Sequence, residues 1–433
     1  MSIDLSPQQA RRIKAMLLNA PVAPGALSPE INVATDEMLG VLEKQYFERE
    51  LAEGISCFKY LEGDYGTGKT QFIHCLARRA HAHDIVTAIV TIGQQCPFSS
   101  PLSIFKNVMV SFVPPPTEDD QVGAQKGIEI LLQAWIRSQL RRLGVTPGNA
   151  VSDAVRRQVE RPFSDLWLGA PDSQMASAMS GLGRRLVALE SGANPTGADH
   201  ELISWCRGDA VRSNNLKQNY SLFEPANDST AFQRLKTVVS FLRERLSYKG
   251  FLVAFDEGTR TGSFRRGTVK QRQAMENMLS MINDNADGEF GGVMFLYAAT
   301  PDFRTDVIQN TYTALRDRIG SVAFVPGRPM TPLIKLDEVN SDAGLMQLGE
   351  RLLEVFEVSD GVVWDRALQH RNMQALIEAQ RRVLAFPGST PPRFFVFHWC
   401  RFLAEQADRQ ITVDQQAAIK FVESNHLPES EEE

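Results

Sequence analysis

The chain has 433 residues, which is too many for one small core and enough for two or three compact units. Hydrophobic residues make up 43% of it and charged residues 23%, so the composition is that of a soluble globular protein and not of a disordered one. The net charge of −6 argues against a protein that coats nucleic acid with its whole surface, although a local basic patch is compatible with it.

Cysteine spacing and hydropathy indicate the cellular compartment in which the protein is expected. The chain contains no C-x-x-C pair, and its five cysteines lie far apart: Cys57, Cys75, Cys96, Cys206 and Cys400. Such spacing is typical of reduced thiols in the cytosol, not of a disulfide framework or a zinc site. No apolar run approaches the length that spans a membrane, and the opening MSIDLSPQQARR has no signal-peptide core. We therefore expect a cytoplasmic protein without membrane contact.

Two helical stretches come first in the chain. The pattern predicts a short amphipathic helix over residues 7–18 and a second helix over residues 35–51, whose apolar residues recur near helical spacing. Together they define an expected N-terminal helical arm, residues 1–51. The sequence leaves open whether these helices pack as an arm on the next domain or serve only as packing helices.

The next segment, GDYGTGKT at residues 63–70, fits the pattern G-x-x-x-x-G-K-[ST], which cradles nucleotide phosphates. Its three glycines permit backbone angles that residues with a Cβ avoid, so successive N–H groups can turn onto an anion. Lys69 is expected to reach the β- and γ-phosphates, and the Thr70 hydroxyl to ligate Mg²⁺. The predicted nucleotide-binding residues are Gly63, Asp64, Tyr65, Gly66, Thr67, Gly68, Lys69, Thr70 and Gln71.

The neighbours of this segment decide between a phosphate loop and an ordinary glycine-rich surface turn. Residues 56–61 (SCFKYL) have the pattern of a strand, and residues 71–80 (QFIHCLARRA) that of a helix. A strand, a glycine-rich loop and a helix in this order are the context in which a phosphate loop occurs. The context therefore favours nucleotide binding.

After the loop, the sequence predicts a buried strand and then mostly helices. Residues 85–92 (IVTAIVTI) are rich in β-branched residues and apolar on both faces, which is typical of a buried parallel strand. Helices are expected over residues 101–112 and 124–143, and Trp135 in the second is expected in the core. Residues 145–228 alternate short helical pieces with segments rich in Gly, Pro and Asn, which indicates a helical insertion.

A second chemical signature lies at residues 251–257 (FLVAFDE), where an apolar run ends in two acids. A buried strand here would deliver Asp256 to a Mg²⁺ ion, and Glu257 would be placed to orient or deprotonate water. By itself such a run is a weak signal. Downstream of a phosphate loop it becomes a strong one.

The remaining chain adds two strands and a helical C-terminal part. Strands are predicted over residues 292–299 and 333–336. Residues 341–424 are mostly helical, and the acidic tail LPESEEE follows them.

Five basic residues follow the two acids, and no acidic residue interrupts them: Arg260, Arg265, Arg266, Lys270 and Arg272. Such a group could grip a phosphate backbone or line the central channel of a ring. The alternative is a solvated loop. Phe264 is the one aromatic residue among these charges, so the sequence gives little support for base stacking, and any contact with duplex DNA should be independent of base sequence.

Taken in order, several of these segments resemble the ATP-binding proteins of BREX phage-defence systems, which are AAA+ P-loop ATPases related to origin-recognition ATPases. The resemblance extends from about residue 10 to about residue 403. Its motifs are GDYGTGKT, CPFSSPL, ISWCRG, YKGFLVAFDEGT, LYAATPDF with TALRDRI, and TPPRFF.

The resemblance implies an α/β fold of the AAA+ P-loop NTPase type. Its parts would be a parallel sheet flanked by helices, a helical insertion at about residues 145–228 and a C-terminal helical lid domain. The corresponding domains are an N-terminal arm (1–51), a nucleotide-binding core (52–340), and the lid with its acidic tail (341–433).

The resemblance also implies roles for residues at matching positions. Thr300 matches a position that senses the γ-phosphate, where related ATPases often carry Asn. Arg316 or Arg318 lies where an arginine finger acting on a neighbouring subunit is expected, and Arg393 resembles a lid arginine that contacts bound nucleotide. For all three arginines the alternative is a surface ion pair.

Two functions remain in competition at this point. The first is an ATP- and Mg²⁺-dependent hydrolase that assembles with copies of itself or with other defence-system proteins. In it Glu257 acts as the base, and Lys69, Thr300, Arg316 and Arg318 complete the catalytic set. The second is a nucleotide-gated switch or scaffold with little turnover. A small-molecule kinase and a nuclease fit poorly, since the sequence shows neither an acceptor site nor a separate carboxylate–lysine cluster.

Overall fold

The computed structural model describes residues 5–20, 22–116, 125–145, 151–164, 167, 169–256, 267–309, 312–337, 341–384, 390–406 and 409–426. The strands are β1 (Cys57–Glu62), β2 (Ile85–Thr91), β3 (Phe112–Val113), β4 (Gly250–Asp256), β5 (Val293–Ala299) and β6 (Leu333–Lys335). None of the helices in these ranges is both long and apolar enough to cross a membrane.

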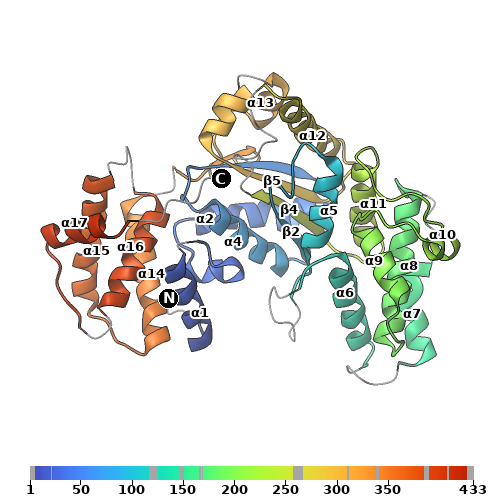
Figure 1. Cartoon of the computed structure of the whole chain (residues 1–433), viewed down its shortest axis with the longest axis horizontal. Coiled ribbons are helices and arrows are strands. Elements are labelled where there is room, and N and C mark those ends of the chain that lie inside the picture. The colour runs from blue at the N-terminus through green and yellow to red at the C-terminus, as the bar shows by residue number, and fades with distance from the viewer. Residues whose placement is uncertain are drawn as a thin grey trace. The chain divides into compact units, whose positions relative to one another are not determined.

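The α-helices are numbered in chain order, and Figure 1 labels most of them. They are α1 (Pro7–Asn19), α2 (Asp36–Leu42), α3 (Leu51–Glu53), α4 (Lys69–Ala82), α5 (Pro101–Ser111), α6 (Ile128–Arg142), α7 (Asp153–Ser164), α8 (Ser173–Glu190), α9 (Gly197–Cys206), α10 (Asn214–Tyr220), α11 (Ala231–Glu244), α12 (Val269–Ala286), α13 (Thr313–Ile319), α14 (Asp342–Asp360), α15 (Arg366–Leu384), α16 (Pro392–Glu405) and α17 (Gln415–Ser424). A 3-10 segment covers Gly25–Ile31, and π-helical segments cover Glu43–Glu50 and Phe303–Gln309.

The chain divides into two compact units. Unit 1 comprises residues 1–41, 61–78 and 323–433, and unit 2 comprises residues 42–60 and 79–322. The segment that carries the phosphate-loop pattern therefore belongs to the same unit as the C-terminal helices.

Six strands form one mostly parallel sheet with the order β3-β2-β4-β5-β1-β6, flanked by helices. Strand β4 is parallel to β2, with Thr91 opposite Asp256, and parallel to β5, with Phe255 opposite Tyr297. Strand β3 is antiparallel to β2. Every residue of β4 and β5 is buried, which explains why these strands are continuous apolar runs. The predicted mixed α/β architecture is confirmed and is consistent with a P-loop NTPase-like fold.

Aromatic packing in unit 2 supports the ends of β4 and β5. The buried Phe98 ring meets the rings of Phe255 and Tyr297 edge to face, with centroids 5.1 and 4.9 Å apart. The Asn277 side chain of α12 donates a hydrogen bond to the Phe98 carbonyl at 2.9 Å. The Cys-Pro-Phe motif thus has a packing role beneath the strand that ends at Asp256.

The helical insertion predicted for residues 145–228 contains α7 to α10. Arg234 of the following helix, α11, packs against it: its buried guanidinium lies 4.6 Å from the Trp205 ring centroid and pairs with Asp172 at 3.3 Å. Trp135 is half-buried, so the prediction of a core position is only partly met. Its indole N–H donates to the Leu246 carbonyl at 2.9 Å, which is the partner that an indole needs away from water.

The C-terminal helices α14 to α17 share a hydrophobic core with the first helix of the chain. Ile13 and Leu17 of α1 lie in this core together with Leu352 of α14 and Trp399 of α16. The Trp399 indole donates to the Gly349 carbonyl at 3.1 Å. The packing partner of α1, which the sequence left open, is therefore the C-terminal helical bundle of unit 1.

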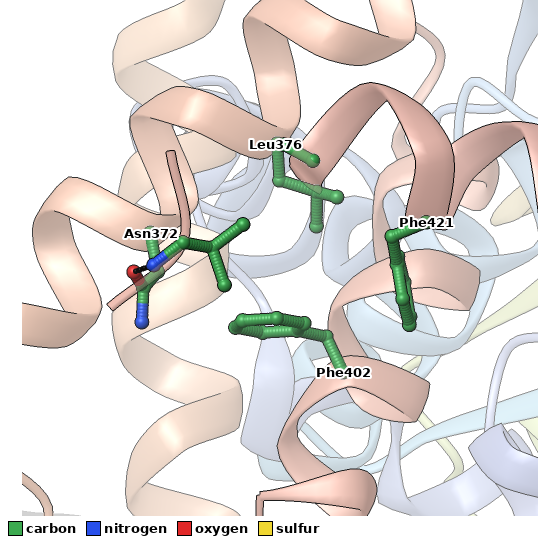
Figure 2. Close-up of a pocket in the computed structure, with 6 residues that line it drawn as sticks. Asn372, Leu376, Phe402 and Phe421 are labelled. Atoms are coloured by element: carbon green, nitrogen blue, oxygen red, sulfur yellow. Dashed lines mark hydrogen bonds between the residues drawn. The ribbon is translucent and has the colours of Figure 1, made fainter. Parts of the chain in front are cut away.

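Figure 2 shows a small apolar pocket inside this bundle, walled by Leu376, Phe402 and Phe421. Its polar side chain is Asn372, whose amide donates to the Gln369 side chain and the Ile411 carbonyl and accepts the Val413 N–H. Because both ends of the amide are engaged, the pocket offers no polar group to a ligand. It is a feature of core packing.

The five cysteines are free thiols, and four of them are buried. Burial raises the pKa of the Cys96 thiol to about 11 and that of Cys400 to about 12. A thiol with such a pKa is almost entirely protonated at neutral pH and is therefore a poor nucleophile.

Two helical glycines allow a paired test of packing in the two units. A Cβ on Gly183 of α8 would lie 2.0 Å from the Phe163 ring, whereas a Cβ on Gly344 of α14 would make an ordinary contact at 3.4 Å. We expect Gly183→Ala to lower the free energy of unfolding by about 1–3 kcal/mol through overpacking. Gly344→Ala should raise it by about 0.5–1 kcal/mol because alanine favours helices. Thermal and urea unfolding of both variants measures this, and a Gly183→Ala protein as stable as the wild type would contradict the Phe163 contact.

Candidate functional site

The predicted phosphate loop lies between β1 and the first turn of α4, as the sequence pattern requires. Gly66 and Gly68 have φ angles of +84° and +100°, which a residue with a Cβ rarely adopts. Gly63 is needed for a different reason, since a Cβ there would lie 2.5 Å from the Thr67 hydroxyl oxygen. The three glycines are therefore explained by two positive φ angles and one close approach.

Hydrogen bonds within the loop hold its lysine in place. The Lys69 ammonium donates to the carbonyl oxygens of Gly63 and Asp64, at 2.8 and 2.9 Å. The Thr67 hydroxyl also donates to the Asp64 carbonyl, at 2.8 Å. Since α4 begins at Lys69, the N–H groups of its first turn and the positive end of its dipole lie at the loop. Thr70 is the second residue of this helix.

Arg393, the predicted lid arginine, contacts the loop directly. Its backbone N–H donates to the Gly66 carbonyl at 3.1 Å. Its guanidinium lies 4.5 Å from the centre of the Tyr65 ring and donates a hydrogen bond to the Tyr65 hydroxyl. The structure thus brings together three residues that the sequence could only propose separately.

Asp337 is a further loop contact that the sequence reasoning missed. Its carboxylate accepts the Asp64 N–H at 3.2 Å, from a position two residues beyond β6. Burial raises the pKa of the Asp337 carboxyl, while the Asp64 N–H and the charge of Lys69 oppose that rise. The sequence signal for Asp337 is an acid just beyond the end of a predicted strand. The same signal led to the prediction of a functional role for Asp256.

Gln71 is engaged with other parts of unit 1. Its side-chain amide donates to the Ser28 carbonyl and lies 3.8 Å from the Cys75 sulfur. These contacts attach α4 to the 3-10 segment Gly25–Ile31. A nucleotide contact by Gln71 stays a prediction.

In unit 2, Asp256 and Thr300 lie at the carboxyl ends of neighbouring parallel strands. Asp256 is the last residue of β4 and is 5% exposed, and its carbonyl accepts the Ile92 N–H at 2.8 Å. Thr300 follows β5 and is half-buried. Ligands of α/β sheets bind at this edge. Glu257, the predicted base, lies outside the described residues.

The predicted arginine fingers lie on α13. Arg316 and Arg318 are both exposed, and Arg316 pairs with its neighbour Asp317 at 3.0 Å. Leu315 and Ile319 anchor the other face of this helix in the core. The arginines are thus presented on the surface of unit 2, which a role toward another subunit would require.

Only part of the predicted basic loop can be placed. Lys270 and Arg272 are exposed on the first turn of α12. Arg260, Arg265 and Arg266 fall outside the residues that the structure describes.

The sequence predicts Thr70 and Asp256 as ligands of a magnesium ion. Within the ranges given above, no three His, Cys, Asp or Glu side chains are grouped to hold a metal ion. Magnesium usually takes one or two protein ligands and completes its shell with water and phosphate oxygens. A buried carboxylate such as Asp256 and a hydroxyl such as Thr70 are donors of this kind.

Comparison with protein families gives a match over most of the chain. The family described as BREX system ATP-binding protein BrxC/D matches residues 7–420 of the chain. Searches of curated proteins and of solved structures gave no match. The family match covers the phosphate loop, Asp256, Thr300 and Arg393, and the chain therefore belongs to the family of BREX system ATP-binding proteins BrxC/D.

Proposed function

We propose that the chain binds ATP with Mg²⁺ at residues 63–71 and hydrolyses it as a subunit of a BREX defence assembly. The observation that carries the proposal is the loop itself, in which Gly66 and Gly68 adopt positive φ angles and the Lys69 ammonium donates to the Gly63 carbonyl. The family to which the chain belongs supports ATP as the nucleotide.

In the proposed mechanism, binding replaces contacts that the loop now makes with itself. The Lys69 ammonium exchanges the carbonyls of Gly63 and Asp64 for phosphate oxygens, where its charge offsets that of the triphosphate. The N–H groups at the start of α4 donate to the same phosphates. Thr70 and Asp256 would hold Mg²⁺, which would neutralise charge on the phosphate oxygens.

Hydrolysis requires a base and stabilisation of the charge that moves to the leaving group. Glu257 follows the buried end of β4 and would accept a proton from the attacking water. Thr300 would orient a γ-phosphate oxygen or that water by a hydrogen bond. Arg393 would donate to the phosphates from the lid side, and Arg316 or Arg318 would act on the site of a neighbouring copy.

A nucleotide-gated switch with little turnover is the second candidate function. The observation that favours it is the direct link from the phosphate loop to α16 through Gly66 and Arg393. Because α16 belongs to the core of the C-terminal helices, a nucleotide that moves Arg393 would be sensed there. The turnover measurement that follows separates the two candidates.

Two substitutions should separate binding from chemistry. We expect Lys69→Ala to abolish ATP binding, because it removes the charge that compensates the phosphates. Glu257→Gln should bind ATP but turn it over at least about 100-fold more slowly, because it removes the base. Isothermal titration and a phosphate-release assay measure both effects, with exposed Lys249→Ala and Glu276→Gln as matched controls. Normal turnover by Glu257→Gln would refute the base, and no turnover by the wild type, alone or with duplex DNA, would favour the switch.

A site shared between subunits can be tested by mixing variants. Lys69→Ala and the double variant Arg316→Ala/Arg318→Ala should each be inactive alone. Mixed, they should regain a substantial fraction of wild-type turnover, because the first variant donates the arginines that the second lacks. Light scattering should show nucleotide-dependent assembly. A mixture as inactive as its parts, or a protein that stays monomeric with ATP, would rule out the trans arginines.

We also propose that the basic segment contacts duplex DNA through its phosphates. Arg265→Ala/Arg266→Ala should weaken filter binding of duplex DNA at low salt and reduce the slope of log affinity against log salt by about 2, since two phosphate contacts are lost. The control is Arg381→Ala/Arg382→Ala, an exposed arginine pair on α15. Equal binding by the wild type and the Arg265/Arg266 variant would exclude this contact.

A further inference from the structure

Tyr65 occupies a variable position of the phosphate-loop pattern, and the residue is 39% exposed. The Arg393 guanidinium lies over this ring and donates a hydrogen bond to its hydroxyl group. Tyr65 therefore contacts the guanidinium both through its aromatic face and through its hydroxyl group. Cation–π contacts of this kind favour arginine over lysine, because the planar guanidinium can stack while its N–H groups still donate.

The backbone fixes where this pair lies. The Arg393 N–H donates to the Gly66 carbonyl, and a Cβ on Gly66 would approach the Arg393 Cβ to 2.9 Å. Arg393 is the second residue of α16, and Phe395, two residues further on, is buried in the core of the C-terminal helices. The Arg393 backbone is therefore held by the loop and by the core of the C-terminal helices. The position of its guanidinium group then depends on the contact with Tyr65.

In the part of the chain that the structure describes, the Nε donor of the guanidinium group has no acceptor in this arrangement. The Arg393 Nε atom is buried and has no hydrogen-bond partner among the described residues. A buried N–H without an acceptor is costly, and the cost is larger on a charged group. An acceptor oxygen brought to the loop would remove this cost, and the phosphate oxygens of a nucleotide are the acceptors that such a loop binds.

From these contacts we infer that Tyr65 is a positioning residue for Arg393. It holds the guanidinium at the phosphate loop, so that nucleotide phosphates meet an arginine that is already ordered. Arginine carries more side-chain entropy than most residues, and a partner that orders it in advance makes phosphate binding less costly. This inference rests on the proposed function, since it assumes that the loop binds ATP.

A double-mutant cycle on ATP affinity tests the coupling. The proteins are the wild type, Tyr65→Ala, Arg393→Ala and the double variant, each titrated with Mg-ATP in the calorimeter. Tyr65→Ala should weaken ATP binding about 5- to 10-fold, which is the range of a partly desolvated cation–π contact. In the Arg393→Ala background the same change should weaken binding less than about twofold, because the residue through which Tyr65 acts is gone.

Further variants distinguish the contribution of the stacked ring to ATP affinity from that of the hydroxyl group and from effects on folding. Tyr65→Phe keeps the ring and should retain most of the affinity, whereas Tyr65→Leu keeps the bulk without the aromatic face and should behave like Tyr65→Ala. Phe223→Ala removes another exposed aromatic residue, 59% exposed in unit 2, and should leave ATP affinity unchanged. Unchanged circular dichroism spectra and unfolding temperatures would show that Tyr65 variants remain folded, and Tyr65→Phe and Tyr65→Leu provide the comparison if Tyr65→Ala does not fold.

The outcomes distinguish this inference from the proposed function. If the wild type fails to bind ATP, or Lys69→Ala binds it equally well, the proposed function fails. If Lys69→Ala abolishes binding but the Tyr65→Ala effect is undiminished in the Arg393→Ala background, the proposed function stands and the positioning role of Tyr65 is overturned. Unchanged ATP affinity in Tyr65→Ala and Tyr65→Leu would overturn it as well.

Discussion

The approach of α16 to the phosphate loop depends on the absence of a side chain at Gly66. Its φ angle of +84° and the 2.9 Å separation that a Cβ would have from the Arg393 Cβ both exclude a larger residue. This one constraint lets the Arg393 N–H reach the Gly66 carbonyl and places the guanidinium beside Tyr65. Because residues of α16 are buried in the core of the C-terminal helices, the geometry of the loop and the packing of unit 1 depend on each other.

Several polar groups of the loop are already engaged within the protein. Lys69 donates to two loop carbonyls, Thr67 to one of them, and Asp337 accepts an N–H from Asp64. A ligand would enter in competition with these bonds and would gain only the difference between old and new contacts. An organised loop also loses less conformational entropy on binding than a flexible one. The two effects on the free energy of binding oppose each other.

Local patterns predicted the elements of this fold well. The strand before the loop and the buried runs at β2, β4 and β5 have the bounds of their sequence patterns to within a few residues, and residues 341–424, predicted to be mostly helical, contain α14 to α17. Burial on both faces leaves a continuous apolar run, and a helix leaves a 3.6-residue period, so these elements can be recognised without tertiary information. The glycines of the loop were predicted for their φ angles, although Gly63 owes its identity to the nearby Thr67.

What the sequence could not supply are contacts between distant segments. The packing of α1 with α14 and α16, the pairing of Tyr65 with Arg393 across 328 positions, and the bond from Asp64 to Asp337 leave no periodic trace. The helix expected over residues 35–51 is interrupted by the π-helical segment Glu43–Glu50, in which Tyr46, Phe47 and Glu50 are buried. The change from i→i+4 to i→i+5 hydrogen bonds there has no counterpart in the apolar pattern of the sequence.

The buried thiols have a practical consequence for anyone who handles this protein. Cys96 lies in the Cys-Pro-Phe turn of unit 2, and Cys400 lies in the helical core of unit 1. Because burial keeps both thiols protonated and out of contact with solvent, an alkylating reagent should reach each of them only when the surrounding structure opens. The two cysteines are therefore built-in probes, one in each unit, and the alkylation rate at each reports the local opening of its own unit.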